Sequence, residues 1–300
     1  YRSFLTGVSN TRPISYAAGM SALLNLLFNY LLVFGKMGFP RMEIEGAACA
    51  SVLSEAISLI YLILWVRQKE LGKEFSCFQF AKPIYSEIRS ILKIAFPVMI
   101  QHVLSLASWL TFFLVIEGIG ERPLAVSNVI RSVYSILMIP LIGLSQATQT
   151  LVSKVIGEGG AEIVNILIKR LMIVSMLSSI VMVALNLINP TLAVSIFTND
   201  ASLIQDSMAI IPIISVSIII FATATVLLSV VSGSGNTIVT MMIEMSTLAI
   251  YLTYTLVAVK KFHVSLPVVW TSEFVYFICI TLFAGGYLYT GEWKNTKVYD

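Results

Sequence analysis

Long runs of apolar residues follow one another along this chain, separated by short polar segments. A membrane-spanning helix needs about 20 mostly apolar residues. Eight runs approach or exceed this length, at residues 14–34, 47–66, 91–116, 124–152, 171–188, 208–231, 237–259 and 266–289. They are too long for the strands of a membrane barrel and show no strand-like alternation. The pattern predicts an all-α integral membrane protein, a polytopic bundle of eight transmembrane helices.

Prolines occur within several of these runs. Pro97, Pro140 and Pro212 lie inside their runs, where a proline removes a backbone hydrogen-bond donor and bends a helix. Pro267 lies at the start of the last run, a position at which helices tolerate proline. We therefore expect kinks in three helices, and we expect Pro267 to be tolerated in the first turn of the last one.

The composition excludes several classes of protein. Charged residues make up 12% of the 300 residues, about half the share found in soluble domains, and the mean hydropathy is +0.90. These values exclude a disordered chain, a collagen-like chain and a soluble enzyme. The chain has two histidines and three cysteines, and the cysteines lie far apart at Cys49, Cys77 and Cys279. We expect no zinc site, no disulfide framework, no cofactor and no nucleic acid partner.

The basic residues between the runs are unevenly distributed. Most of the 19 lysines and arginines fall on one side of the membrane if the N-terminus lies inside the cell, and cytoplasmic segments are enriched in these residues. Both termini are then cytoplasmic. The one long polar segment, residues 68–90, is then a cytoplasmic linker between two helical bodies, residues 1–67 and 91–300.

Two pairs of short segments indicate an internal repeat. Gly7-Val8-Ser9-Asn10-Thr11 is similar to Gly233-Ser234-Gly235-Asn236-Thr237, and Met20-Ser21 matches Met245-Ser246 at nearly the same spacing. The matching helices are an even number of spans apart, so both copies have the same orientation, as in parallel repeats. If residues 91–300 form a complete six-helix copy, residues 1–67 hold the last two helices of the other. We would then expect four further helices before Tyr1.

Several motifs in this order resemble the MATE (multidrug and toxic compound extrusion) family. They are the loop Gly7–Pro13, the helical segment Asn25–Gly35, the small-residue segment Ile44–Ser51, the proline-containing Ala95-Phe96-Pro97, the segment Gly120–Asn128 and the turn Gly157–Ala161. The resemblance implies a twelve-helix fold of two lobes, of which this chain holds eight helices. Residues 1–67 would be the last two helices of the N-lobe, and residues 91–300 the six-helix C-lobe with a cytoplasmic tail.

The same resemblance implies a function. MATE proteins are cation-coupled exporters that rock between inward-facing and outward-facing states. We therefore expect a secondary-active multidrug efflux antiporter in a bacterial inner membrane. It would work as a monomer and export small organic, often cationic, compounds in exchange for Na⁺ or H⁺.

Polar residues inside the first two runs are candidates for ion binding. Asn25 and Asn29 are four residues apart and share one helix face. The resemblance implies that they and Ser51 form part of a Na⁺ site, together with an aspartate from a helix outside this chain. The alternative is that they hydrogen-bond between helices. Glu55, four residues after Ser51, is either a proton carrier or a member of a structural pair.

The longer body carries a second group of candidates. His102 is either a proton site or a buried neutral histidine. At Ser105 some relatives place a cation-binding glutamate, and residues 208–231 contain no acid, so we expect no such charged site there. Glu244 lies near the inner end of its helix, where we expect it to reach the membrane surface. The candidates for the cavity or the substrate are Gln101, Ser105, Asn128, Arg131 and Glu273.

Arg131 is the one basic residue placed inside a run, and an unpaired charge in a bilayer is costly. Arg131 lies seven residues into its run from the outer end, and Glu273 lies seven residues into its own run from the outer end. The two residues therefore lie at equal depth in the membrane. We expect Arg131 to pair with Glu273, or with Glu117 as second choice, at the border of a central cavity. The alternative is that Arg131 extends alone toward the lipid head groups.

Three other functions are open to this sequence. A lipid-linked oligosaccharide flippase of the same superfamily would need a strongly cationic cavity, and Arg131 alone is available inside the helices. A membrane enzyme would need paired carboxylates or histidines at helix ends, which the sequence does not show, so we expect no enzyme. A chain without the first four helices could also be a fragment that does not transport.

Overall fold

The structure is a computed structural model that describes residues 1–69, 75, 84–160 and 162–295. It divides into two compact units, Tyr1–Pro83 (unit 1) and Ile84–Asp300 (unit 2). The division falls within the segment 68–90, for which we predicted a linker, although most of that segment, with Cys77, lies outside the described residues. Residues 85–90 belong to a helix that begins at Tyr85, so for them the linker prediction is wrong.

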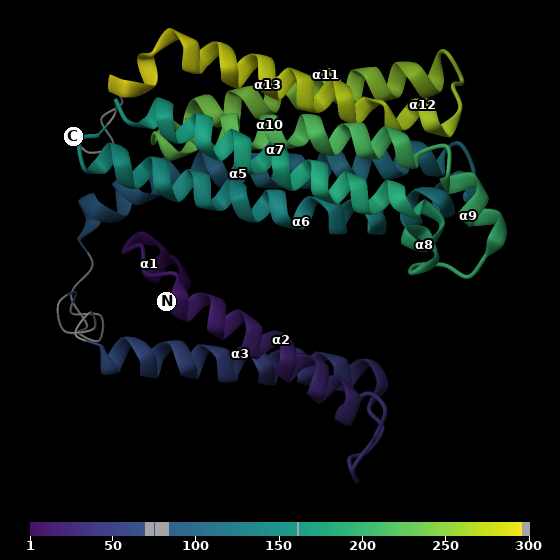
Figure 1. Ribbon diagram of the computed structural model, residues 1–300, viewed down its shortest axis with the longest axis horizontal. Coiled ribbons are helices and arrows are strands. Elements are labelled where there is room, and N and C mark those ends of the chain that lie inside the picture. Colours follow the sequence, from purple (N-terminus) through teal and green to yellow (C-terminus); the bar gives the residue numbers. More distant parts are fainter. Residues whose placement is uncertain (70–74, 76–83, 161, 296–300) are drawn as a thin grey trace. The chain divides into compact units, whose positions relative to one another are not determined.

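Eight helical segments of the described residues are long and apolar enough to cross a membrane, which confirms the all-α class and the eight predicted spans. Unit 1 contains two of them and unit 2 contains six (Figure 1). Their bounds are α2 Arg12–Leu32, α3 Glu43–Gln68, α5 Tyr85–Glu117, α6 Glu121–Gly157, α7 Val164–Ile188, α10 Ile211–Gly233, α11 Thr237–Lys260, and α12 Leu266–Trp270 with α13 Ser272–Thr290. The shorter elements are α1 Arg2–Gly7, α8 Pro190–Ser195, α9 Ala201–Ser207 and the 3₁₀ turn Glu292–Asn295.

One prediction about helix shape is wrong, and Pro267 lies in the first turn of its helix as predicted. Helix α10 begins at Ile211, so Pro212 occupies the first turn rather than the interior of the helix. In the first turn a missing N–H group costs nothing, and no kink is required. The last run is divided at Thr271 into α12 and α13. Pro97 and Pro140 do lie inside α5 and α6.

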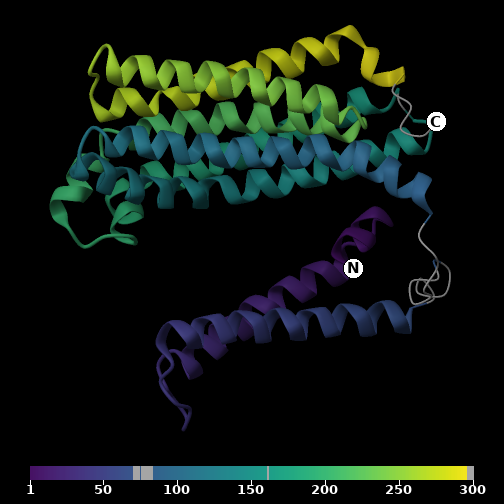
Figure 2. The ribbon, with the colours of Figure 1, turned by 180° about the vertical axis from the view of Figure 1, so that it is seen from behind.

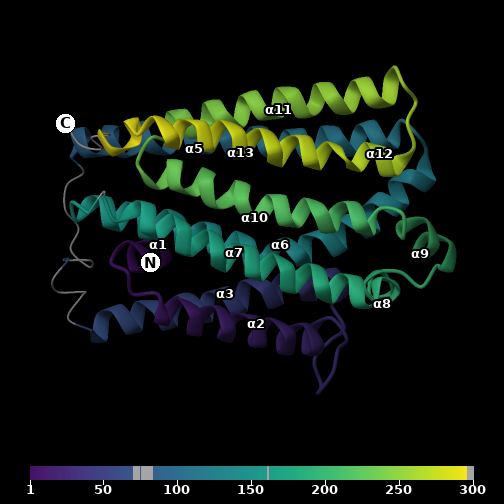
Figure 3. The same ribbon diagram turned by 45° about the horizontal axis from the view of Figure 1, so that its top comes forward.

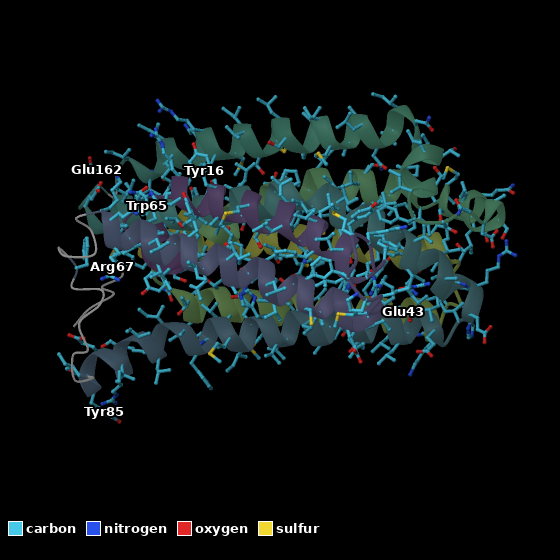
Figure 4. The ribbon with its side chains drawn as sticks, turned by 90° about the horizontal axis from the view of Figure 1, so that it is seen from below. Tyr16, Glu43, Trp65, Arg67, Tyr85 and Glu162 are labelled. Atoms are coloured by element: carbon cyan, nitrogen blue, oxygen red, sulfur yellow. The ribbon has the colours of Figure 1, made fainter. Side chains whose placement is uncertain are left out.

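Unit 1 is an antiparallel hairpin of α2 and α3, preceded by α1. A Cβ atom on Gly46 would lie 2.7 Å from the carbonyl oxygen of Leu32, so the two helices approach at backbone distance there. Further along, the Ser58 hydroxyl donates to the carbonyl oxygen of Ala17 at 3.2 Å. Figure 4 shows Glu43 at one end of α3 and Trp65 and Arg67 at the other. Most residues between these two ends are apolar, as expected for a spanning helix.

Unit 2 is a bundle in which six long segments lie side by side (Figures 2 and 3). Helix α10 packs against α6, α7 and α13, and α11 packs against α5 and α13. The short helices α8, α9 and α12 lie together at one end of this unit (Figure 1). The core between the helices is aliphatic and aromatic and includes Phe112, Tyr134, Trp270 and Phe277. Unlike a soluble domain, the bundle exposes many large apolar side chains on its outside, as lipid contact requires.

The two turns of the proposed repeat have the same backbone conformation. Ser9 has φ 58° and its counterpart Gly235 has φ 87°. In each turn this residue donates its backbone N–H to the carbonyl oxygen three residues earlier, Thr6 at 3.0 Å and Ser232 at 3.1 Å. The left-handed conformation strains a serine but suits a glycine. The shared conformation supports a structural origin of the sequence match.

We expect Gly233→Ala to destabilise unit 2 by about 1–3 kcal/mol. A Cβ atom at Gly233 would lie 2.7 Å from the backbone carbonyl oxygen of Gln149 in α6, so α6 and α10 would have to move apart. Thermal unfolding of the purified chain measures the effect. The control is Gly143→Ala in α6, where a Cβ atom meets nothing within 4 Å. If both variants unfold at the same temperature, the close contact of α6 with α10 is unimportant for stability.

Candidate functional site

The three polar candidates of unit 1 form one hydrogen-bonded chain. The Asn29 side-chain amide donates to Asn25 Oδ1 at 3.0 Å, and the Asn25 amide donates to Ser51 Oγ at 3.2 Å. Ser51 Oγ in turn donates to the carbonyl oxygen of Ala47. The chain links α2 to α3, as the hydrogen-bonding interpretation requires. Asn29 Oδ1 is buried and has no partner among the described residues, so one hard oxygen ligand remains free at this place.

Glu55 forms a salt bridge within unit 1. Both carboxylate oxygens accept hydrogen bonds from Arg2 Nη2, at 2.9 and 3.2 Å. The two side chains are 50% and 60% exposed, and exposed pairs of this kind contribute little to stability. Of the two interpretations of Glu55, the geometry favours the structural pair.

Unit 2 contains a cavity of about 330 Å³ between its helices. Its wall is built by α5, α6, α10, α11 and α13, and it combines aromatic rings with a small number of hydroxyl and charged groups. The lining residues are Ser105, Ser108, Trp109, Arg131, Tyr134, Ser135, Met138, Phe221, Leu248, Tyr251, Glu273, Tyr276 and Phe277. A mostly apolar pocket of this size with few polar groups is the usual form of a small-molecule site.

Glu273 is the carboxylate of this cavity. It lies in the first turn of α13, where the helix dipole favours a negative charge. Its side chain is only 4% exposed. The Tyr134 hydroxyl donates to one carboxylate oxygen at 3.1 Å, and the Tyr251 hydroxyl donates to the other at 3.3 Å. Two phenols from α6 and α11 therefore hold the carboxylate in place at the wall.

Arg131 lines the same cavity, but the predicted ion pair is absent. Arg131 forms no salt bridge within 4.0 Å with Glu273, with Glu117 or with any other described acid. Its guanidinium lies over the ring of Phe113, 5.0 Å from the centroid. The phenols already occupy both oxygens of Glu273, and a cation over an aromatic face is itself attracted to the ring. The pairing prediction is therefore wrong, although both residues border one cavity.

The remaining candidates of α5 and α6 separate into two groups. Ser105 lines the cavity. Gln101 and Asn128 lie outside its lining. His102 is exposed on the surface of unit 2 and forms no hydrogen bond or salt bridge within the described part of the chain. The interpretation of His102 as a buried neutral histidine is therefore wrong.

The sequence did not predict that a second acid, Glu244, and three tyrosines would lie at or beside this cavity. Glu244 is only 2% exposed and accepts hydrogen bonds from Ser105 and Tyr276, so our expectation that it reaches the membrane surface is wrong. Glu244 and Tyr251 are seven residues apart in α11 and therefore lie on one face, as two helical turns require. This spacing was the available signal. Unit 2 thus contains two buried acids although α10 contains none.

A larger depression of about 630 Å³ lies on unit 2 along α11, between that helix and the segment from Phe262 to Val268. Its lining is apolar apart from Thr253 and Tyr254, and it contains no acid, imidazole or cationic side chain. The depression therefore has the shape of a binding site but no acidic, imidazole or cationic side chain that could bind a charged ligand. The smaller cavity around Glu273 is the candidate functional site.

Known proteins resemble this chain over nearly its whole length. The MatE family model matches residues 97–257. A probable multidrug resistance protein NorM of Thermotoga maritima is 27% identical over 302 residues, which is 99% of this chain and 64% of that protein. A protein of the same name from Agrobacterium fabrum is 29% identical over 160 residues, covering 53% of this chain and 34% of the relative. The chain spans less than two thirds of the length of these relatives.

Solved structures show the same fold. A crystal structure of MATE in the straight conformation has a TM-score of 0.84 at 16% identity and covers 97% of this chain and 65% of its own. A MATE transporter of Vibrio cholerae has a TM-score of 0.83 at 14% identity, over 99% of this chain and 67% of its own. The spans establish a multi-pass membrane protein. Because the family model matches more than half of its residues, the chain belongs to the MatE family, whose members are membrane transporters rather than enzymes.

Proposed function

We propose that the chain is part of a secondary-active multidrug exporter, which moves organic and often cationic compounds out of the cell in exchange for Na⁺ or H⁺ by alternating access. The relatives named as probable multidrug resistance proteins support this proposal. The structural observation that carries it is one buried carboxylate, Glu273, in a cavity whose wall is otherwise mainly aromatic and apolar.

The cavity wall suits organic cations. Aromatic rings of Trp109, Tyr251 and Phe277 face the cavity and attract cations through their π electrons. Glu273 adds a negative charge, for which no described cation within 4.0 Å compensates. An organic cation that enters would pair with this carboxylate and contact the rings. The acid also argues against the flippase alternative, which would place basic groups around an anionic lipid.

The same carboxylate can couple the export of an organic cation to the entry of H⁺ or Na⁺. A proton or Na⁺ on Glu273 and an organic cation beside it would compete for one negative charge, so binding of one favours release of the other. Carboxylate and amide oxygens are suitable ligands for Na⁺. Asn29 Oδ1, held through Asn25 to Ser51, is a second candidate ligand within unit 1. We further propose that the protein acts as a monomer in a bacterial inner membrane with both termini in the cytoplasm.

The experiment that tests this proposal measures uptake of the fluorescent cation ethidium into inside-out membrane vesicles that contain the protein. An imposed gradient of H⁺ or of Na⁺ should drive uptake, and dissipation of the active gradient should abolish it. Empty vesicles provide the background. If neither gradient drives ethidium movement, or if movement requires ATP, the proposed antiport is wrong.

We expect Arg131→Ala to lower the maximal export rate by about fivefold, which corresponds to roughly 1 kcal/mol. The guanidinium places a positive charge at the cavity, so its loss should strengthen binding of an organic cation and slow its release. The KM for ethidium should fall together with the rate. Arg122→Ala is the control, because Arg122 pairs with Asp206 at 2.7 Å and does not line the cavity. Equal effects of both variants would contradict a role of Arg131 in the cavity.

A further inference from the structure

The apolar depression along α11 ends beside two lysines. On α11 it extends from Ala249 to Ala258, nine residues or about 14 Å at the rise of an α-helix. The helix ends at Lys260, and Lys261 is the first residue after it. The depression therefore starts next to the turn that joins α11 to α12 (Figure 1) and runs along the helix to the middle of the span.

The turn after α11 folds back and forms the second wall of the depression. The backbone N–H of Phe262 donates to the carbonyl oxygen of Val257 at 3.3 Å, and the N–H of Val264 donates to that of Ala258 at 3.3 Å. Phe262 and Val264 thereby lie beside the end of α11, and both line the depression. Val268 of α12 lines it as well. The depression is thus a groove between two walls rather than the plain surface of one spanning helix.

The groove has few polar groups for a ligand. The Tyr254 hydroxyl lies 2.9 Å from Thr271 Oγ1. Thr271 Oγ1 already donates to the carbonyl oxygen of Val268, so Tyr254 is the donor and its hydroxyl is satisfied within the protein. Thr253 is the one other polar residue of the lining. An occupant of the groove must therefore be mainly apolar where it contacts α11.

The two lysines at the end of the groove have no acidic partner. Both are exposed, and neither forms a salt bridge within 4.0 Å with an acid in the described part of the chain. Lys261 Nζ lies 5.8 Å from the centroid of the Phe262 ring, and Phe262 lines the groove. This ammonium group is therefore located at the rim. The positive charge at this end of the groove suits an anion.

The length of the groove matches one leaflet of a bilayer. The hydrocarbon core of a bilayer is about 30 Å thick, so one leaflet contributes about 15 Å, close to the length of the groove. The lysines lie at the end of the spanning helix, where lipid head groups lie, and lysines at this level attract anionic lipids. Two cations followed by an apolar groove that reaches the middle of the span have the order of a phospholipid, with its phosphate outside and its acyl chain inside.

We propose that this groove binds one anionic phospholipid from the leaflet at this end of unit 2. An acyl chain lies along α11 between Ala249 and Ala258, and the phosphate lies at Lys260 and Lys261. A zwitterionic lipid gains less from the two lysines, because its head group carries a positive charge of its own. The residues that line the groove differ from those that line the cavity around Glu273, so the proposal does not rest on the proposed function.

Native mass spectrometry of the purified chain, released from detergent micelles with added phosphatidylglycerol, tests the charged end of the site. We expect one phosphatidylglycerol per chain, and phosphatidylcholine with the same acyl chains should bind about tenfold more weakly. Lys260→Gln combined with Lys261→Gln should weaken phosphatidylglycerol binding about 25-fold, because each lysine contributes roughly fivefold. The control is Lys36→Gln, since Lys36 is exposed and follows α2 in unit 1. Equal binding of the two lipids, or no loss in the double variant, would overturn the proposal.

Ala249→Trp tests the apolar end of the site independently. Ala249 is exposed and lines the groove near the middle of the span, so a tryptophan there fills the groove without disturbing buried packing. Crowding should weaken phosphatidylglycerol binding about tenfold. The control is Ala107→Trp in α5, because Ala107 is also exposed, lies ten residues before the end of its helix and does not line the groove.

Two results of the tryptophan experiment would contradict the proposal. If Ala249→Trp binds phosphatidylglycerol as tightly as Ala107→Trp does, the acyl chain does not occupy the groove. If the spectra show a dimer of the wild type that Ala249→Trp separates, the groove is an interface between two copies of the chain instead of a lipid site. Neither result depends on transport, so this proposal and the proposed antiport fail independently.

Discussion

Glu273→Gln should lower gradient-driven ethidium export by about tenfold or more. A hydrogen bond or contact with a charged group contributes about 1.5–3 kcal/mol, and tenfold corresponds to 1.4 kcal/mol. Glutamine has nearly the same shape and retains an oxygen acceptor for one phenol, so the wall formed by Tyr134 and Tyr251 should persist. The variant loses the negative charge for which the drug and the coupling cation compete. Export should fall, and the remaining transport should no longer follow the H⁺ or Na⁺ gradient.

The control for this prediction is the same substitution at Glu55. Glu55 also lies in a spanning helix, but it is 60% exposed and paired with Arg2. Its replacement should leave most of the export intact, because exposed pairs contribute little. Protein levels in the membrane must be equal for both variants. If Glu55→Gln and Glu273→Gln reduce export to the same extent, the special role of the cavity carboxylate is refuted.

Trp270→Ala should destabilise unit 2 by about 3–5 kcal/mol, the usual cost of removing a buried tryptophan side chain. Trp270 has no exposed surface. Its ring lies 5.3 Å from Phe112 and 6.2 Å from Tyr134, measured between centroids. Its indole N–H donates to Ser127 Oγ at 3.2 Å. The truncated variant would leave a cavity beside Tyr134, one of the two phenols that hold Glu273.

Thermal unfolding of the detergent-solubilised chain measures this effect. Phe262→Ala is the control, because Phe262 lies nearby in sequence but is 65% exposed, and substitutions at exposed positions usually change stability by less than about 0.5 kcal/mol. A Trp270→Ala protein that unfolds at the same temperature as Phe262→Ala would show that the aromatic cluster is not required for the stability of unit 2.

The sequence by itself determined the class of fold and the spans. Hydropathy and length are local properties, and a bilayer accepts only segments that satisfy their own backbone hydrogen bonds. For this reason all eight spans were found to within a few residues at one or both ends, and the family motifs pointed to the correct family. Hydropathy was less reliable for the exact residue at which a helix begins, and that residue decides whether a proline bends the helix. Pro212 was placed in a helix interior, although α10 begins one residue before it.

The pairing of polar groups was decided by the tertiary structure alone. The sequence placed Arg131 and Glu273 at equal depth, but depth does not tell in which direction a side chain points around its helix. In the folded chain Tyr134 donates to Glu273 and Ser105 donates to Glu244, and each of these pairs is 139 residues apart in sequence. No local pattern encodes a contact over that distance. Packing of α5, α6, α11 and α13 fixes the rotation of each helix about its axis. This rotation decides that Glu273 faces the cavity and that Glu244 lies behind its wall.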